Sequence, residues 1–276
     1  LRDVIKRYGL SARKGLGQHF LLDANLTQRI VRAAGDLTGR HVIEIGPGPG
    51  GLTRALLDSP AECIYAIEKD RRCLDALGDL KSRYGDRLQV IEGDGLEIDI
   101  PNIVQGPRKI VANLPYNVAT PMLLRWLRDA TAFEAMTLMF QTEVADRLVG
   151  VPRTKAYGRL SVITQWLCTV TKAFNVSKDA FTPPPKVSST VVTLTPRSEP
   201  VAPAEWTDIE TVTAAAFGQR RKMLRSSLKS LGIDPKLAGV VETARAEELS
   251  VAEFCALARL LPHTDNRSAL ALASSQ

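Results

Sequence analysis

Short hydrophobic runs, rich in Val and Ile, recur along the first two thirds of the chain. They cover residues 41–46, 63–68, 88–93, 109–113, 135–141 and 191–196. Runs of this length that are bounded by turn residues predict buried β-strands. Amphipathic helical patterns lie between several of them, for example in 51–59 (GLTRALLDS) and 71–80 (RRCLDALGDL). Strands that alternate with helices predict βαβ units, and therefore a largely parallel sheet with helices on both faces.

The pattern changes after residue 196. The stretch 197–205 (RSEPVAPAE) is polar and proline-rich, which predicts a linker. From 206 to 261 the hydrophobic spacing is helical only, as in 219–231 (QRRKMLRSSLKSL) and 251–261 (VAEFCALARLL). We therefore predict an α/β domain over residues 1–197, a small all-helical domain over 204–262 and a flexible tail over 263–276.

Composition narrows the class of protein only a little. The 276 residues are 45% hydrophobic and carry a net charge of +6, which leaves an anionic partner such as nucleic acid open. The four cysteines form no C-x-x-C pair and have no metal-ligand spacing with the histidines, so we expect reduced thiols in a cytoplasmic protein without a metal site. No apolar run approaches the length of a membrane span, and no membrane association is expected.

A glycine-rich loop follows the first predicted strand in VIEIGPGPGGLTRALL (42–57). Gly46, Gly48 and Gly51 satisfy the dinucleotide pattern G-x-G-x-x-G, whereas Gly46, Gly48 and Gly50 satisfy E-x-G-x-G-x-G, the pattern of S-adenosylmethionine (SAM) methyltransferases. A pyrophosphate needs backbone N–H donors from such a loop, and Pro47 and Pro49 have none to give. SAM contains no phosphate, so the prolines count against a dinucleotide more than against SAM.

Acidic side chains stand at the ends of the next two predicted strands. Glu68 closes the second strand and could accept both ribose hydroxyls of a nucleoside cofactor. Asp94 follows the third strand and could accept the cofactor's adenine amine. Open α/β sheets bind ligands along the edge where the carboxyl ends of parallel strands meet. The strand ends together therefore predict a cofactor crevice, although each acid alone is equally typical of a surface turn.

The fourth strand ends in Asn113-Leu114-Pro115-Tyr116. After this strand, [DNS]-[ILP]-P-[YFW] resembles the motif of Rossmann-type methyltransferases that modify the amino groups of bases. Pro115 fixes its own φ and keeps Leu114 extended, which could direct the Asn113 side-chain oxygen and the Leu114 carbonyl toward one point. Tyr116 would offer a flat face for stacking a base. Taken alone, the motif is better explained as a proline turn.

Six segments together are more specific than any one motif. They are GLGQHFLLD (15–23), EIGPGPG (44–50), NLPYNVATP (113–121), KAYGRLSV (155–162), FTPPPKVSSTVV (181–192) and FGQRRKMLRSSL (217–228). Their order and spacing, from about residue 13 to residue 261, resemble the KsgA family of ribosomal RNA adenine dimethyltransferases, in its bacterial form. The resemblance implies a Rossmann-like, SAM-dependent methyltransferase of ribosome biogenesis. Its substrate would be two adjacent adenines near the 3′ end of 16S ribosomal RNA in the small subunit, and we expect a monomer.

The resemblance also implies the residues of the site. SAM would be bound by His19, Leu21, Gly46, Gly48, Gly50, Glu68, Asp94 and Asn113. The reaction would depend on Asn113, Leu114, Pro115 and Tyr116, with Phe181 as a second ring that sandwiches the flipped target adenine. One position departs from the family, because most relatives carry Asn where this chain has His19.

Basic side chains gather in two stretches outside the predicted crevice. Arg153 and Lys155 lie in a predicted loop, and Arg220, Arg221, Lys222 and Arg225 lie in the predicted helix 219–231. Positions 221, 225 and 229 would share one face of that helix and suit the phosphates of structured RNA. The N-terminal segment adds Lys6, Arg7, Arg13 and Lys14. A solvated basic surface is the alternative for all of them.

Three other functions remain open from the sequence. An Erm-type enzyme, which dimethylates an adenine of 23S ribosomal RNA, shares the glycine loop and the N-L-P-Y signal. A non-catalytic RNA-binding assembly factor would retain the fold with a silent site. An NAD-dependent oxidoreductase is disfavoured by Pro47 and Pro49 and by the lack of a hydride-transfer constellation.

Overall fold

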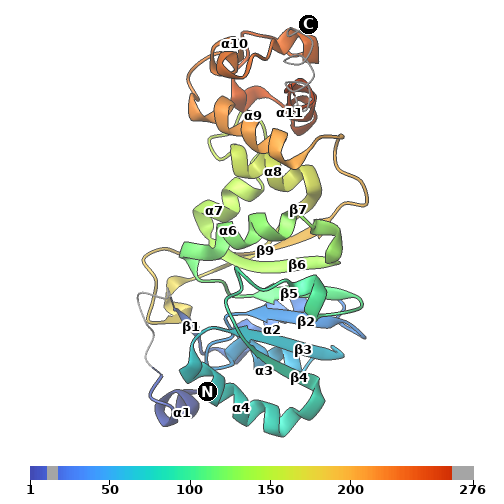
Figure 1. Cartoon of the computed structure of the whole chain (residues 1–276). Helices are drawn as coiled ribbons and strands as arrows, with labels where there is room; N and C mark the ends of the chain where they lie inside the picture. Colours follow the sequence, from blue (N-terminus) through green and yellow to red (C-terminus); the bar gives the residue numbers. More distant parts are fainter. Residues whose placement is uncertain (11–17, 263–276) are drawn as a thin grey trace, which may run out of the picture. The chain divides into compact units, whose positions relative to one another are not determined.

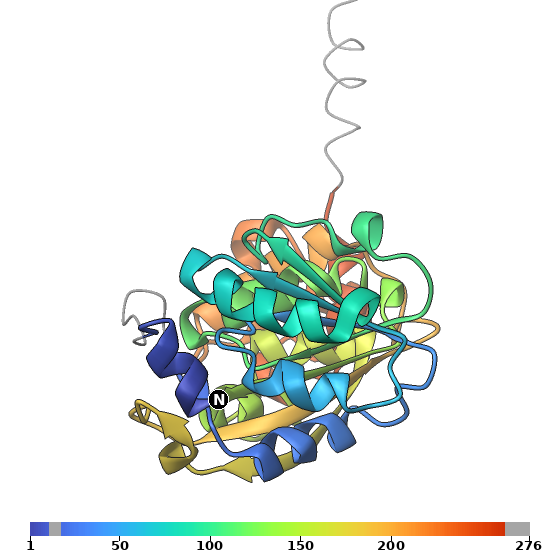
Figure 2. The same ribbon diagram turned by 90° about the horizontal axis from the view of Figure 1, so that it is seen from below.

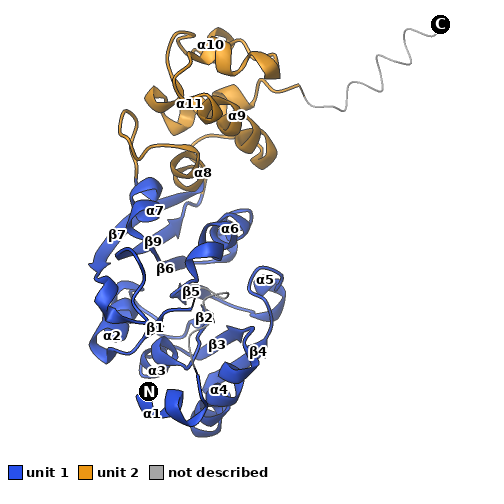
Figure 3. Cartoon of the chain, turned by 90° about the vertical axis from the view of Figure 1, so that its left-hand side faces the viewer, with its two compact units in different colours: residues 1–149, 167–198 blue, residues 150–166, 199–276 orange. Residues whose placement is uncertain are grey.

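The chain folds into two compact units. The computed structural model describes residues 1–10 and 18–262, so the predicted tail over 263–276, together with Arg13 and Lys14, lies outside the described residues. One unit contains residues 1–149 and 167–198, and the other contains 150–166 and the chain from 199 onward (Figure 1 and Figure 3).

A seven-stranded sheet forms the centre of the first unit, in the order β4-β3-β2-β5-β6-β9-β7. The first five of these strands run parallel, and β9 pairs antiparallel with both β6 and β7. The six predicted strands are confirmed, and the sheet has the predicted Rossmann-like form. Their bounds are β2 His41–Ile45, β3 Cys63–Glu68, β4 Leu88–Glu92, β5 Arg108–Ala112, β6 Ala135–Gln141 and β9 Ser189–Pro196.

Strand β7 (Cys168–Val176) was not predicted from the sequence. It lies at the edge of the sheet, and most of its side chains are exposed, so it lacks the continuous hydrophobic run of the buried strands. A second, two-stranded sheet was also missed. It pairs β1 (Phe20–Leu21) with β8 (Phe181–Thr182) and so joins segments about 160 residues apart in sequence.

Helices cover the sheet between the strands. They are α1 Arg2–Arg7, α2 Ala24–Ala33, α3 Gly51–Leu57, α4 Arg71–Tyr84, α5 Ile100–Ile103, α6 Tyr116–Leu127 and α7 Thr142–Leu148. The predicted N-cap of α2 is confirmed, because the carboxylate of Asp23 accepts from the N–H of Asn25 at 2.8 Å. Val4 and Ile5 of α1 and the following Leu10 pack against Cys73 and Ala76 of α4, and Figure 2 shows this side of the unit.

The strand order creates an opening at one edge of the sheet. After β2 the chain adds β3 and β4 on one side, and then returns to place β5 on the other side of β2. At such a reversal the two crossover connections leave the sheet in opposite directions, so a crevice forms beyond the carboxyl ends of the strands. Here that crevice lies where the glycine loop follows β2 and Asn113 follows β5.

The second unit is helical, as predicted. It contains α8 (Arg159–Leu167), α9 (Trp206–Gly218), α10 (Leu224–Ser227) and α11 (Val251–Ala258), connected by short 3₁₀ turns. Helix α11 begins at a capping box in which Ser250 and Glu253 satisfy each other's backbone N–H groups.

The segment 150–166 belongs to this helical unit, whereas the sequence placed it in the sheet domain. Tyr157 is fully buried and its hydroxyl donates to the carbonyl of Leu249 at 2.8 Å. The N–H of Arg153 donates to the carbonyl of Glu247 at 2.7 Å. These bonds join the segment to residues about 90 positions later, which no local pattern could predict.

The predicted helix over 219–231 is wrong. Residues 219–222 form a turn after α9, Met223 makes an isolated bridge with Arg245, and only Leu224–Ser227 is α-helical before a 3₁₀ turn. The expected helical face of residues 221, 225 and 229 therefore does not form.

In the described part of the chain, no helix combines the length and the hydrophobicity needed to cross a membrane.

Two glycines, one inside α4 and one at its C-cap, allow a paired test of how backbone conformation affects stability. Gly78 lies inside the helix and Gly85 ends it with a φ of +57°, and a Cβ added at either would meet nothing within 4 Å. Ala at 78 should raise the free energy of unfolding by about 0.5–1 kcal/mol, because Ala loses less backbone entropy in a helix. Ala at 85 should lower it by about 1–2 kcal/mol, because its φ disfavours L-residues. Urea denaturation of both variants measures the difference, and a shift of the same sign in both would contradict this account.

Candidate active site

A cavity lies in the crevice at the carboxyl ends of β2, β3, β4 and β5. It brings together ten of the residues that the sequence singled out from five different segments. They are His19, Leu21, Gly46, Gly48, Glu68, Asp94, Asn113, Leu114, Pro115 and Tyr116. Gln18, Glu44, Gly51, Lys69, Asn117 and Met122 also line it and were not predicted.

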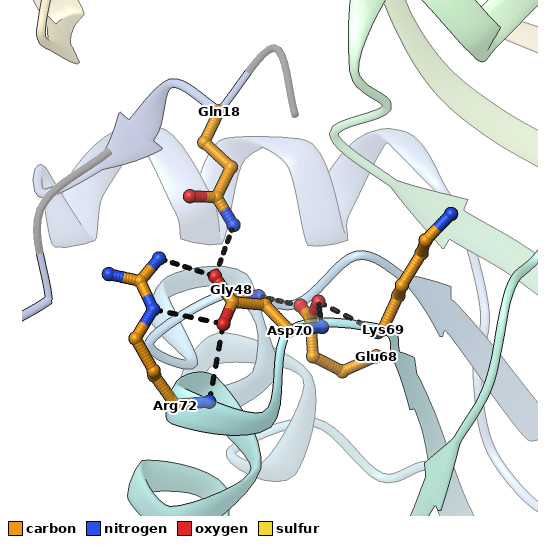
Figure 4. A network of polar contacts seen from close by, with 6 residues as sticks. All are labelled: Gln18, Gly48, Glu68, Lys69, Asp70 and Arg72. Atoms are coloured by element: carbon orange, nitrogen blue, oxygen red, sulfur yellow. Dashed lines mark hydrogen bonds and ion pairs between the residues drawn. The ribbon is translucent and has the colours of Figure 1, made fainter. Parts of the chain in front are cut away.

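Glu68 ties the glycine loop to the turn that follows β3. Its Oε2 accepts from the N–H of Gly48 at 2.9 Å, and its Oε1 accepts from the N–H groups of Lys69 and Asp70 at 2.8 and 2.7 Å (Figure 4). Burial raises the pKa of Glu68, and the three backbone donors oppose that shift. A carboxylate offers about four acceptor positions. Glu68 therefore keeps acceptor capacity for a hydroxyl donor from a ligand, with most of it on Oε2.

Asp70 extends this network to the N-terminal segment. Its carboxylate caps α4 and accepts from the guanidinium of Arg72 and from Nε2 of Gln18, the latter at 3.2 Å (Figure 4). The Arg72 hydrogen bond is the main cause that lowers the pKa of Asp70. Gln18, the residue before His19, is thus linked through Asp70 to the turn that follows β3.

Asp94 stands at the end of β4 and is already paired. Its Oδ2 accepts from Nζ of Lys69 at 2.7 Å, and its Oδ1 accepts from the N–H of Leu96 at 3.0 Å. The Lys69 hydrogen bond is the first cause that lowers the pKa of Asp94, so this carboxylate stays ionised and can accept an amine from a ligand as well. The sequence offered no sign of Lys69, because a lysine in EKDRR is typical of any exposed turn.

Glu44 is a buried acid at the floor of the cavity, on β2. It is 2% exposed, and the hydroxyl of Thr53 donates to its Oε2 at 2.6 Å. Burial raises the pKa of Glu44 to about 8, with a smaller contribution in the same direction from the charge of Glu68. In the sequence, Glu44 is an acid inside the apolar run HVIEIG and the first residue of the E-x-G-x-G-x-G pattern. The sequence predicted no separate role for it.

Asn113 follows β5 and has a defined amide orientation. Its Nδ2 donates to the carbonyl of His19 at 3.2 Å, so its Oδ1 remains an acceptor at the cavity. Pro115 precedes α6, and its carbonyl accepts the first helical bonds, from Val118 and Ala119. The Leu114 carbonyl precedes α6 and therefore does not accept any of the first backbone hydrogen bonds of this helix.

Tyr116 begins α6 with its ring at the cavity. Its hydroxyl is 2.5 Å from Oγ of Ser189, and burial raises its pKa against the opposing effect of that bond. The ring of His19 lies beside it, with centroids 5.7 Å apart and planes 29° from parallel.

Phe181, predicted as the second ring that contacts the base, does not join the residues that line the cavity. It is 3% exposed, belongs to the core of the sheet unit and does not line the cavity. Pairing of β1 with β8 sets Phe181 opposite Leu21 and turns its ring toward that core. The ring of His19 contacts it edge-on, at 6.3 Å between centroids.

Gly50 also departs from its predicted role. It does not line the cavity, and a Cβ there would come within 2.8 Å of Leu80, so this glycine lets α3 approach α4. Gly51 does line the cavity, and a Cβ there would come within 2.5 Å of the backbone carbonyl of Leu21. The close approach of β1 to the glycine loop therefore depends on Gly51.

The charged groups of the cavity suit a cationic cofactor. Among the described residues, the carboxyl groups of Glu44, Glu68 and Asp94 line it together with the ammonium of Lys69, and Glu44, with its pKa raised to about 8, is largely uncharged at neutral pH. SAM carries a sulfonium and an ammonium against one carboxylate, whereas a dinucleotide brings a pyrophosphate that these acids would repel. The residues present fit SAM, and the described residues hold no cluster of His, Cys, Asp or Glu suited to a metal ion.

The predicted RNA-binding residues belong to the helical unit and not to the sheet unit that contains the cavity. Arg153, Lys155, Arg221, Lys222 and Arg225 are exposed. Arg220 is exposed as well, but it also has partners within the unit, because its Nε pairs with Glu247 at 2.9 Å and its NH2 group donates to the carbonyls of Lys155 and Tyr157, each at 3.1 Å. Arg220 thus joins the turn 219–222 to the loop 150–158, which brings the two basic stretches into one unit.

The protonation of Glu44 should appear in the stability of the protein. Its folded-state pKa of about 8 exceeds the ordinary value of 4.5, so the unfolded chain releases a proton that the folded chain keeps. The free energy of unfolding should therefore fall as pH rises between about 4.5 and 8, by up to about 1.4 kcal/mol per pH unit for this group. Replacing Glu44 with Gln keeps an acceptor for Thr53 and should flatten this decline in urea denaturation. Glu199→Gln, at an exposed acid, is the control, and an equal slope in both variants would contradict the assignment.

Comparisons with known proteins agree with this geometry. The family model described as "Ribosomal RNA adenine dimethylase" matches residues 9–262. The chain is 61% identical to "Ribosomal RNA small subunit methyltransferase A" of Paramagnetospirillum magneticum, covering 95% of this chain and 94% of the relative. It is 59% identical to the protein of the same name from Rhodospirillum rubrum, over 94% of this chain and 91% of that one.

Solved structures extend the comparison. A dimethyladenosine transferase from Plasmodium falciparum superposes with a TM-score of 0.75 and 26% identity, over 87% of this chain and 96% of that one. The 23S ribosomal RNA methyltransferase ErmE superposes with a TM-score of 0.65 and 27% identity, over 88% of this chain and 99% of that one. The methyl donor of the family is SAM, which fits the acids of the cavity. The chain belongs to the ribosomal RNA adenine dimethylase family.

Proposed function

We propose that this protein transfers methyl groups from SAM to the N6 amines of two adjacent adenines near the 3′ end of 16S ribosomal RNA, in the small subunit or its precursor. The observation that carries the proposal is the orientation of Asn113 at the end of β5. Its Nδ2 donates a hydrogen bond to the His19 carbonyl, so its Oδ1 can accept a hydrogen bond from an amine that enters the cavity. A ring suited to stacking, that of Tyr116, stands three residues later at the same cavity.

The N6 amine of adenine is a poor nucleophile, because its lone pair is delocalised into the ring. Two acceptors on its N–H groups, Oδ1 of Asn113 and the carbonyl of Leu114, favour a pyramidal nitrogen whose lone pair is localised. These bonds strengthen as positive charge develops on the nitrogen, so they stabilise the transition state more than the ground state. The second methylation offers only one N–H, so one of the two acceptors then loses its partner.

Bound SAM supplies an electrophilic methyl group on a sulfonium sulfur. The cavity residues hold the two reactants in line, and this placement contributes much of the rate. The N6 ammonium that results is acidic and loses its proton to water, so no strong general base is required. In this proposal Glu68 would bind the ribose and Asp94 the adenine amine of the cofactor, and His19, Leu21, Gly46 and Gly48 would contact its methionyl part; the support is that all six residues line the cavity.

The target adenine has to leave its stack to reach Asn113. Tyr116 can stack on it, and its hydroxyl bond to Ser189 holds the ring in place. The exposed basic residues of the helical unit, Arg153, Lys155, Arg221, Lys222 and Arg225, are proposed to contact RNA phosphates. We propose that the enzyme acts as a monomer in the cytoplasm, where ribosomal subunits assemble.

The similarity to ErmE supports a second candidate, a dimethyltransferase of 23S ribosomal RNA. The relatives with 59–61% identity carry small-subunit names, which favours the first candidate. Mass spectrometry of RNA after incubation with this protein and SAM separates the two. Two dimethyladenosines near the 3′ end of 16S RNA, from isolated small subunits, would support the proposal. Modification of naked 23S RNA alone would support the Erm-type activity, and no modification of either would refute both.

Replacing Asn113 with Ala should largely abolish methyl transfer. By analogy with the loss of one transition-state hydrogen-bond partner, kcat/KM should fall by about 10²–10³-fold. SAM binding should weaken but stay detectable by calorimetry, because Glu68 and Asp94 remain. Asn102→Ala, on an exposed helix of the same unit, is the control. Full activity of the Asn113 variant would eliminate the proposed role.

Arg221 and Arg220 should respond differently to the same substitution. Arg221→Gln should reduce the slope of log Kobs for RNA against log salt concentration by about one, because one phosphate contact is lost. Arg220→Gln should lower the unfolding midpoint, because three internal partners are lost, namely Glu247 and the carbonyls of Lys155 and Tyr157. Filter binding at several salt concentrations and urea denaturation measure the two effects. Identical salt slopes for wild type and Arg221→Gln would count against a phosphate contact there.

A further inference from the structure

We propose that Lys69 is a positioning residue for the adenine of the cofactor. Its ammonium holds the Asp94 carboxylate in the direction from which it accepts the adenine amine, so that the site selects a 6-amino purine over a 6-oxo purine. This inference rests on the role that the proposed function gives to Asp94 and makes that role more specific. The sequence patterns include Glu68 and Asp94 but not Lys69.

The ion pair joins two strand ends at one cavity. Lys69 directly follows β3, Asp94 lies two residues after β4, and both residues line the cavity. The N–H of Lys69 donates to Glu68, whereas its side chain points away from the Glu68 carboxylate (Figure 4). At the end of that side chain, Nζ lies 2.7 Å from Oδ2 of Asp94. Lys69 therefore connects the residue proposed for the ribose to the residue proposed for the adenine amine.

The backbone around Asp94 is held without the Lys69 ammonium. The Asp94 carbonyl accepts from the N–H of Glu97 at 2.8 Å. The guanidinium of Arg125, on α6, donates to the three backbone carbonyls of residues 96–98. Loss of the ammonium should therefore leave this loop in place and act on the carboxylate alone.

Two donors hold the Asp94 carboxylate, one on each oxygen. The N–H of Leu96 donates to Oδ1 at 3.0 Å, and Lys69 donates to Oδ2. The terminal torsion of an Asp side chain is broad, so the Leu96 bond alone leaves the carboxylate free to rotate. A carboxylate has about four acceptor positions, and this side chain is 23% exposed, so acceptor capacity remains for a ligand. Lys69 sets the direction of that remaining capacity.

The effect of Lys69 is on direction and not on charge. Its hydrogen bond is the first cause that lowers the pKa of Asp94, but a carboxyl with the ordinary value of 3.8 is ionised at neutral pH without it. An ionised carboxylate only accepts, so it pairs with the 6-amine of adenine and repels the 6-oxo group of hypoxanthine. The Lys69 side chain is 60% exposed, and ion pairs this exposed contribute little to folding.

Two ligands that differ at the 6-position of the purine ring provide the test. S-adenosylhomocysteine carries an amine there, and S-inosylhomocysteine carries an oxo group. Calorimetry with the full-length protein measures the Kd of each, and the ratio of the inosyl Kd to the adenosyl Kd measures selectivity. A general change in charge or folding affects both ligands alike and leaves this ratio unchanged. Circular dichroism verifies that each variant is folded.

In the wild type, the inosyl ligand should bind about 10- to 100-fold more weakly, the range of a hydrogen bond to a charged group. Lys69→Met keeps the length of the side chain and removes the ammonium. It should lower the ratio by about 3- to 10-fold, the net contribution of one hydrogen bond. Lys69→Arg keeps a charged donor and should retain most of the selectivity.

Arg71→Met is the matched control. Arg71 also follows β3 and pairs with Glu92 at the end of β4, at the same distance of 2.7 Å. Neither residue of this second pair is among those that line the cavity. The substitution therefore removes a neighbouring ion pair between the same two segments and should leave the ratio at its wild-type value.

The inference is overturned if Lys69→Met leaves the ratio unchanged or raises it, or if Arg71→Met lowers it equally. A fall as large in Lys69→Arg as in Lys69→Met would also count against a role for the charged donor. Asp94→Asn separates these results from the proposed function, because an amide offers both a donor and an acceptor and should bring the ratio close to one. An unchanged ratio in Asp94→Asn would refute the cofactor contact proposed for Asp94, and the role of Lys69 with it.

Discussion

The carboxylate of Glu68 holds the two turns on which the cavity depends. It receives the N–H of Gly48 from the loop after β2 and those of Lys69 and Asp70 from the turn after β3. A buried carboxylate costs several kcal/mol unless it is hydrogen-bonded, and three backbone donors offset that cost here. Because both turns share one acceptor, a ligand that contacts Glu68 is positioned against both turns at once.

The other half of the site depends on a pairing between distant segments. His19 immediately precedes β1, and the pairing of β1 with β8 holds this N-terminal segment at the cavity, which both His19 and Glu68 line. The bond from Asn113 to the His19 carbonyl then joins β5 to that segment. The orientation of the Asn113 amide, on which the proposed chemistry relies, thus depends on the segment held by a strand of only two residues.

The strength of the hydrophobic signal decides how much of the fold was predictable. Strands β2, β3, β5 and β6 lie inside the sheet and are mostly buried, so their apolar runs are continuous and their positions follow from the sequence. Strand β7 is an edge strand with exposed side chains and gives no such run. In 219–231 the spacing of Met223, Leu224 and Leu228 imitates a helix. The internal partners of Arg220 favour a turn instead, and Met223 is 39% exposed.

The site shows the same division between local and long-range causes. The rule that parallel strands end at one edge was sufficient to bring Glu68, Asp94 and Asn113 together. It says nothing about Phe181, whose place depends on the register that sets it opposite Leu21. It also says nothing about the charge of Glu44, which depends on how deeply β2 is buried. With burial raising the pKa of Glu44 to about 8, this acid is largely protonated at neutral pH and adds little negative charge to the cavity. The acids of the cavity thus repel one another less when no cation is bound. If a cationic ligand favours loss of the proton from Glu44, the cavity gains a further negative charge opposite that ligand.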